Sequence, residues 1–191
     1  MDEKSVIIAS VCSLLGKGAP DAAAHLLRRD YPFAPEGVTV RRYGPVESTC
    51  VYVRDGFIDR YTGAQLIFPP VLRVVSAMLP SEFPFHPNWK TTKTHPAFWE
   101  LGATVDHLVT VTRGGADDES NWVTISMARN SAKMNWTLDE LGWTLHPPGD
   151  VREWDGMMRW FLEYTKEHPE TSSNASVRQW YRAAELITGV S

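Results

Sequence analysis

A stretch near the middle of the chain collects side chains suited to hydrolytic chemistry: Asp106, His107, Asn121, Asn130 and Lys133. Hydrolysis of a phosphodiester bond requires a base that activates water and a cation that stabilises the phosphate oxygens. His107 has the side chain of a general base. The Asp106 carboxylate and the Asn130 amide offer the oxygen ligands that Mg²⁺ or Mn²⁺ prefers. No other part of the 191 residues concentrates chemistry in this way.

Two strands and a helix must position these side chains. The stretch is predicted to fold as strand, loop, strand and helix, over residues 104–111, 112–121, 122–125 and 127–134. Because successive strand side chains point to opposite faces, Asp106 and His107 can serve one site only at a strand end or a distorted edge. The nearby loop is consistent with a strand end. Asn130, early in the helix, is expected to approach Asp106.

This stretch resembles the HNH endonucleases, whose motif folds as a β-hairpin, a helix and a metal ion (the ββα-metal core). The resemblance is carried by the Asp-His pair at 106–107, the Gly-Gly turn at 114–115, Asn121 and Asn130. It covers residues 104–135 and extends weakly back to Asp59. Single pieces are common by chance, whereas the full set with both spacings in this structural order is specific.

The resemblance implies a role for each residue. His107 is the general base, and Asp106 and Asn130 hold one divalent metal ion. Asn121 ties the loop between the strands and keeps His107 in position. Lys133, one helical turn after Asn130, neutralises a phosphate as a point charge.

Two features depart from the family pattern. Asn130 stands where many members have His, which favours Mg²⁺ or Mn²⁺ over zinc. Many members also bind a structural zinc through two CxxC pairs, but this chain has Asp59 with Thr62 and Ser126 with Arg129 at those places. No structural zinc is therefore expected. An ion pair between Asp59 and Arg129 is predicted to replace it.

Other groups have weaker support from the sequence. Arg113 is a second candidate for the phosphate contact. The run Asp117-Asp118-Glu119 is interpreted as a solvated acidic turn opposite the site. His86 and His95 lie in a proline-rich loop over residues 80–96, which contains no Cys and is weak evidence for zinc. Because long irregular loops often carry function, this loop is a candidate flank of the site.

The rest of the chain is predicted to be mainly helical. Helices are expected over residues 5–15, 22–29, 71–79, 151–167 and 177–187, with a short helix begun by the capping box at Thr137–Glu140. Strands are expected over residues 38–42 and 49–53. The fold class is therefore α+β, with a ββα-metal core and helical N- and C-terminal elements. The predicted divisions are an extension over 1–50, the nuclease core over 51–145, and C-terminal helices packed on it over 146–191.

Composition limits the possible functions. The net charge of −4 counts against a tight non-specific DNA-binding protein, although a nuclease needs only a local positive field. Cys12 and Cys50 form no CxxC pair and no disulfide framework. The apolar run over residues 6–15 is too short to span a membrane and follows Asp2-Glu3-Lys4, so no signal peptide is expected. A cytoplasmic location and no membrane partner are predicted.

The sequence thus predicts a metal-dependent endonuclease, a hydrolase that cuts DNA. One rival is a non-catalytic nucleic-acid-binding or partner-binding module of the same fold, which the acidic net charge favours. Another is a nuclease acting on RNA or structured DNA, which the same hydrolytic centre would serve. A restriction or phage-defence role rests on family analogy alone. A homodimer formed through the C-terminal helices would let protomers with one site each cut both strands.

Overall fold

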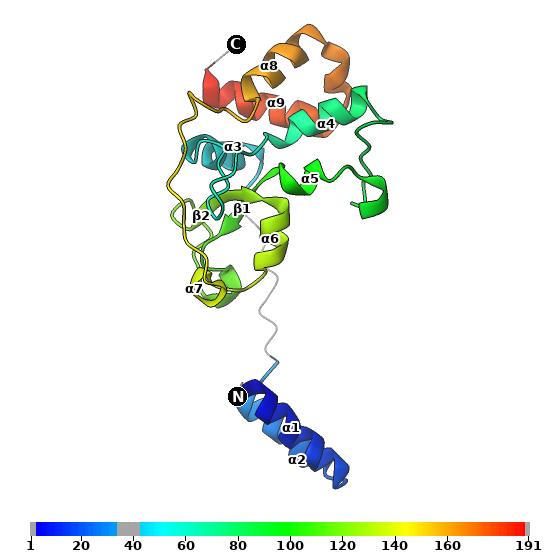
Figure 1. Ribbon diagram of the computed structural model, residues 1–191, viewed down its shortest axis with the longest axis vertical. Helices are drawn as coiled ribbons and strands as arrows, with labels where there is room; N and C mark the ends of the chain where they lie inside the picture. Colours follow the sequence, from blue (N-terminus) through cyan, green and yellow to red (C-terminus); the bar gives the residue numbers. More distant parts are fainter. Residues whose placement is uncertain (1–2, 34–42, 190–191) are drawn as a thin grey trace. The chain divides into compact units, whose positions relative to one another are not determined.

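The computed structural model describes residues 3–33 and 43–189 of the chain (Figure 1). These residues combine helices with one two-stranded antiparallel sheet, so the predicted α+β class is confirmed. Residues 1–39 and 40–191 form two separate units. The division therefore falls earlier than the predicted boundary at residue 50. The strand predicted over 38–42 lies outside the described residues.

The first unit is a pair of helices, α1 (Glu3–Gly16) and α2 (Pro20–Asp30). Both were predicted, with boundaries within two residues of those observed. The turn between them contains Gly18 at a φ of 69°, a left-handed conformation that glycine adopts without steric cost. Pro20 stands at the first position of α2, where its fixed φ suits a helix start.

The larger apolar core of the second unit lies among four helices. These are α3 (Pro45–Arg54), α4 (Pro69–Met78), α8 (Met158–Glu167) and α9 (Ala175–Thr188), which lie in the upper part of Figure 1. Helix α9 contacts the other three. Between them the fully buried rings of Phe68 and Phe161 meet edge to face, with centroids 5.5 Å apart.

Helix α3 corrects the strand predicted over residues 49–53. It starts with Pro45 at its first position, and the side chain of Glu47 accepts a hydrogen bond of 2.8 Å from the backbone N–H of Gly44. Thr49 and Val51 are buried. Their β-branched side chains favour strands, but the start signals and the packing of α3 against α9, β1 and β2 outweigh that preference.

Helix α8 begins later than the predicted start at residue 151. Residues 151–157 form turns, and Gly156 and Met157 have φ values of 61° and 65°. A side chain at Gly156 would collide with the ring of Phe57. The apolar residues that suggested a longer helix, such as Trp154, contact the same core from this turn.

The sheet consists of β1 (Ala103–His107) and β2 (Trp122–Ser126), paired with His107 opposite Trp122. Helix α6 (Met127–Lys133) follows β2 at once. The predicted order of strand, loop, strand and helix is therefore present, with a shorter first strand. The remaining short elements are η1 (Thr91–Lys93), α5 (Ala97–Glu100), η2 (Val111–Arg113), α7 (Leu138–Leu141) and η3 (Pro169–Ser173). The capping box predicted at Thr137–Glu140 starts α7.

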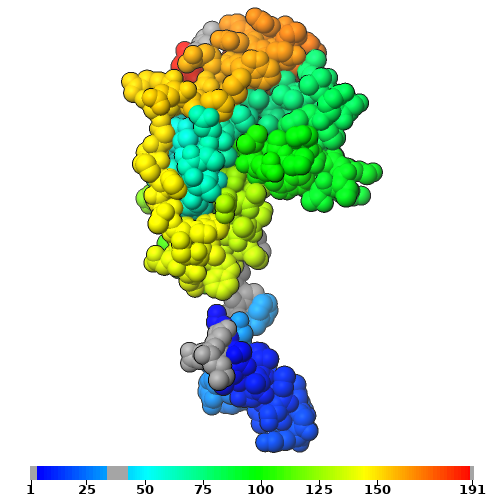
Figure 2. Space-filling view, viewed as in Figure 1, coloured from blue at the N-terminus to red at the C-terminus, as the bar shows by residue number. Residues whose placement is uncertain are grey.

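A buried carboxylate fastens the sheet to α3. Asp55, directly after α3, accepts hydrogen bonds from the side chains of Arg54 and Arg60 and, at 2.7 Å, from the backbone N–H of Thr124 in β2. The Asp55 carbonyl also accepts from Gly149, which lies in the extended segment between α7 and α8. Figure 2 shows this segment, in yellow, along the surface beside α3. The helices, the sheet and this segment thus form one framework around β1 and β2.

The described helices include none that is long and apolar enough to cross a membrane.

Candidate active site

Asp106 and His107 project from opposite faces of β1. Asp106 contacts Tyr61, which belongs to a small second core beneath the sheet. His107 lies on the other face with Trp122, which belongs to the larger core. The site predicted as one unit is therefore divided by the strand into a His107 side and an Asp106 side.

On the His107 side, the ring is paired with a carboxylate. His107 Nε2 lies 2.9 Å from Asp117 Oδ1, and the two side chains are only 12% and 11% exposed. The interpretation of Asp117 as part of a solvated turn opposite the site is therefore wrong. No local pattern in the sequence marks this contact, because it depends on how the loop over residues 108–121 folds back.

The contacts of Nε2 define the protonation of the ring. Besides Asp117, the indole Nε1 of Trp122 lies 3.0 Å from the same nitrogen. One ring nitrogen cannot donate to a carboxylate and accept from an N–H at once. Because the bond to an ionised acceptor is the stronger one, we assign the proton to Nε2, facing Asp117. The lone pair of a neutral His107 is then on Nδ1, which has no hydrogen-bond partner among the described residues.

Asn121 ties the loop that carries Asp117. Its amide oxygen accepts from the N–H of Val109 at 2.9 Å, and its amide nitrogen donates to the carbonyls of Val109 and Ala116 at 2.7 Å. Gly115 packs so closely against this arrangement that a Cβ would overlap the Val109 carbonyl. The tie predicted for Asn121 is present in the structure.

Replacing Asn121 with alanine is expected to lower the free energy of unfolding by about 2–3 kcal/mol, because buried backbone groups lose their partners. Urea denaturation measures this loss, and limited proteolysis should cleave faster within residues 108–120. The control is Asn88→Ala, an exposed residue of the loop over 80–96, which should stay within about 0.5 kcal/mol of the native protein. Equal stability of the two variants would show that the tie contributes nothing.

On the Asp106 side, the carboxylate is already paired with a positively charged side chain. The fully buried ammonium of Lys133 lies 3.0 Å from Asp106 Oδ2. The hydroxyl of Tyr61 donates to the same oxygen at 2.7 Å. Burial and then the Asp106 carboxylate raise the pKa of Tyr61, so this hydroxyl stays protonated and remains a donor. The ammonium predicted to meet a phosphate is instead enclosed by the protein.

The edge of β1 that faces away from β2 is covered by side chains. Alternate residues of a strand turn their carbonyls to the same edge. Three of these carbonyls accept from side chains: Ala103 from Tyr52 Oη at 3.3 Å, Val105 from Asn130 Nδ2 at 3.2 Å, and His107 from Lys133 Nζ at 2.7 Å. Asn130 and Lys133 thus join α6 to β1.

The Asp106 side offers oxygen atoms of the type that a hard divalent ion prefers as ligands. Asp106 Oδ1 and Asn130 Oδ1 accept no hydrogen bond from residues 3–33 and 43–189, and Mg²⁺ and Mn²⁺ prefer carboxylate and amide oxygens. Within those residues, no group of three or more His, Cys, Asp or Glu side chains is placed to hold a metal. Water would therefore complete the coordination shell. A bound ion would also share the carboxylate with the Lys133 ammonium.

The ion pair predicted between Asp59 and Arg129 is not formed. The buried Asp59 carboxylate accepts hydrogen bonds of 2.9 Å from the backbone N–H groups of Tyr61 and Ser126. The Arg129 guanidinium instead lies over the ring of Trp143, 5.3 Å from its centroid. Asp59 still joins the two segments, but through backbone donors, which already satisfy both of its oxygens.

Arg113, the second candidate for a phosphate contact, belongs to a surface pair. Its guanidinium lies 2.6 Å from a carboxylate oxygen of Glu140, and both side chains are more than one third exposed. The backbone N–H of Thr137 and then Arg113 lower the pKa of Glu140 to about 2. Arg113 thus links η2 to the start of α7.

The two histidines of the loop over residues 80–96 have local partners. His86 Nδ1 accepts from the N–H of Asn88, and His95 Nδ1 accepts from the N–H of Ala97. The His95 ring also stacks on Phe83, with centroids 4.3 Å apart. These contacts assign both histidines to the folding of the loop.

Comparisons with known proteins return no match: no family model, no curated protein and no solved structure is similar to this chain. Any functional assignment therefore depends on the residues and their geometry.

Proposed function

We propose that this protein is an HNH-type endonuclease that hydrolyses phosphodiester bonds in DNA, with β1, β2 and α6 as its ββα-metal core. The observation that supports the proposal is the pair of His107 and Asp117 at the end of β1, held by the loop that Asn121 ties. A histidine oriented by a partly buried carboxylate has the arrangement of a general base.

His107 and Asp117 would divide the proton transfer between them. His107 Nδ1 accepts a proton from the attacking water, and the ring becomes an imidazolium. Asp117 holds the other ring proton on Nε2 and stabilises the positive charge that develops, as a carboxylate does beside a catalytic histidine in other hydrolases. Asp117 is thus a positioning residue, and His107 is the catalytic residue.

Mg²⁺ or Mn²⁺ is the proposed cofactor, with Asp106 and Asn130 as its ligands. When bound, such an ion would supply positive charge to the phosphate and leaving-group oxygens. Because Asp106 and His107 leave β1 on opposite faces, the phosphate would have to lie across the end of the strand to meet both the ion and the base. Lys133 carries a positive charge against Asp106 in the structure, so its ammonium and a divalent ion compete for this carboxylate.

The test is incubation of a supercoiled plasmid with the native protein and Mg²⁺, Mn²⁺ or EDTA. We expect nicked or linear DNA with either metal and none with EDTA. If RNA or branched DNA is cleaved while the plasmid stays intact, that nucleic acid replaces duplex DNA as the proposed substrate. The enclosed pair of Lys133 and Asp106 favours one rival, a non-catalytic binding module. Binding of the plasmid without cleavage of any nucleic acid would overturn the nuclease proposal in favour of that module.

A further inference from the structure

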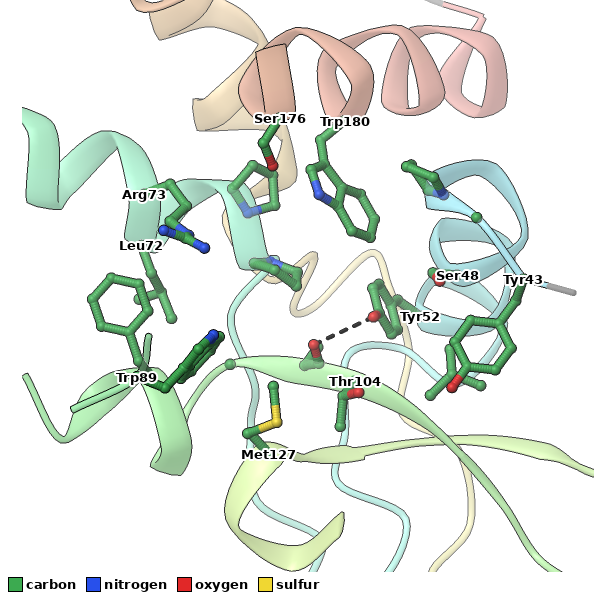
Figure 3. A pocket seen from close by; sticks show the side chains of 18 residues that line it. Tyr43, Ser48, Tyr52, Leu72, Arg73, Trp89, Thr104, Met127, Ser176 and Trp180 are labelled. Carbon is green, nitrogen blue, oxygen red and sulfur yellow. Dashed lines mark hydrogen bonds between the residues drawn. The ribbon is translucent and has the colours of Figure 1, made fainter. Parts of the chain in front are cut away.

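A cavity of about 330 Å³ opens beside the covered edge of β1 (Figure 3). Its walls come from helices α3, α4, α5, α6 and α9, from β1 and from the loop over residues 80–96. Its aromatic and basic side chains are Tyr43, Tyr52, Arg73, Trp89, Phe98 and Trp180. The volume lies at the lower end of the range for small-ligand sites. None of the residues singled out for chemistry in the sequence lines this cavity.

Arg73 is the charged group of the cavity. Its guanidinium stacks on the ring of Phe85, 3.3 Å from the centroid, and points toward the cavity in Figure 3. Across the described residues, no carboxylate pairs with it and no acceptor receives its N–H groups. Burial lowers the pKa of Arg73. The half-buried guanidinium keeps its donor groups available, so it is suited to a ligand that carries acceptor atoms.

Two tryptophans provide flat walls with further donors. Trp89 and Trp180 line the cavity, and neither indole N–H has an acceptor among the described residues. By contrast, Trp154 donates to the carbonyl of Leu66 at 2.8 Å. Trp89 also has a φ of 52°, a strained conformation for a bulky residue and one that recurs where a backbone holds a ligand. The cavity thus combines aromatic faces with unused donors.

Tyr43 connects this cavity with the His107 side of the site. It lines the cavity, and its ring centroid lies 6.0 Å from that of His107 and 5.4 Å from that of Trp122. A ligand in the cavity is therefore separated from the general base by one side chain. A nucleotide adjoining the bond that is cut has a base at this short range from the reacting phosphate.

We propose that the cavity binds one unstacked nucleobase of the DNA substrate, with its ring against the aromatic walls and its acceptor edge toward Arg73. Stacking on tryptophan and hydrogen bonds to an extruded base edge are how proteins hold single bases. This inference rests on the proposed function, because it identifies the ligand as part of the substrate. It predicts that DNA with an unpaired base is the preferred substrate.

The test compares two labelled duplexes that differ only by one bulged base, with binding measured by fluorescence anisotropy in EDTA. We expect the native protein to bind the bulged duplex about tenfold more tightly. Arg73→Gln and Trp89→Ala should remove this preference. Arg152→Gln and Trp160→Ala should retain it, because these residues lie outside the cavity. Quenching of tryptophan fluorescence by free dGMP measures binding of a base outside a strand.

The outcomes separate this inference from the proposed function. Plasmid cleavage without a preference for the bulge, or with a preference that Arg73→Gln retains, overturns the inference and leaves the nuclease intact. Arg73-dependent quenching by dGMP without DNA binding or cleavage assigns the cavity to a free nucleotide. That result overturns the DNA-base inference together with the nuclease proposal.

Discussion

Replacing His107 with alanine is expected to lower the rate of plasmid nicking by a factor of about 10²–10⁴, the usual contribution of a general base. The variant lacks the imidazole that, among the described residues of the His107 side, is paired with a carboxylate and would take the proton from water. The loop keeps its tie through Asn121, so folding should be retained. The measurement is the initial rate of loss of supercoiled DNA with Mn²⁺ in excess.

His168→Ala is the matched control. His168 stacks on Tyr164 at the end of α8, and its side chain is 42% exposed. The His168→Ala variant should therefore cleave at the native rate. A His107→Ala protein that is folded and as active as this control would remove His107 from the mechanism.

Asp117→Asn separates positioning from structure. Loss of the carboxylate should lower kcat for nicking by at least about tenfold and leave KM for the plasmid near the native value, because Asp117 positions the ring and does not bind the substrate. A native kcat in the folded variant, or a KM that rises with no fall in kcat, would contradict the positioning role of Asp117.

Replacing Lys133 with methionine is expected to lower the free energy of unfolding by about 3–5 kcal/mol in EDTA, because Asp106 is left as a buried, uncompensated charge. Thermal and urea denaturation measure this loss. Adding Asp106→Asn to the same chain removes the second charge, so the double variant should recover most of the stability. Additive losses would contradict a direct coupling between the two side chains.

Mn²⁺ should stabilise the Lys133→Met variant, whereas the substitution itself destabilises it. An ion bound to the native state stabilises it by mass action, and without the ammonium the Asp106 carboxylate is available. Mn²⁺ is therefore expected to raise the melting temperature of Lys133→Met more than that of the native protein, with tighter Mn²⁺ binding by EPR titration. Equal Mn²⁺ affinity in both proteins would show that Lys133 does not compete with the ion.

The sequence predicts the elements of this fold better than their contacts. Apolar periodicity and caps are local, and they place α1, α2, α4 and α9 as well as the strand, loop, strand and helix around residues 103–133. The strand predicted over 49–53 was wrong because the β-branched composition of this segment is outweighed by the helix start at Pro45 and by the packing of α3 against α9, β1 and β2. The predicted start of helix α8 was wrong because Gly156 forms a left-handed turn against the ring of Phe57, a residue distant in the sequence.

The candidate site shows the same limit at the level of single side chains. The tie made by Asn121 could be predicted, since its partners lie within the same loop. The contact of Asp117 with His107 could not, because acidic residues in a loop resemble a solvated turn. Lys133 was expected at a phosphate because it lies one helical turn after Asn130 in the motif. Lysine is rarely buried without a partner, and the position of Asp106 explains its burial. Asp59 does not form the predicted ion pair with Arg129 because backbone N–H groups already bind its carboxylate oxygens.

The covered edge of β1 has a consequence for how the protein behaves at high concentration. A two-stranded sheet has two open borders, and unpaired carbonyls on such a border attract strands from other copies of the chain. The side chains of Tyr52, Asn130 and Lys133 donate hydrogen bonds to the carbonyls of alternate β1 residues. Because these acceptors are taken, no further strand can add in register along this border. The same three side chains therefore protect this border of the sheet from strand-to-strand aggregation.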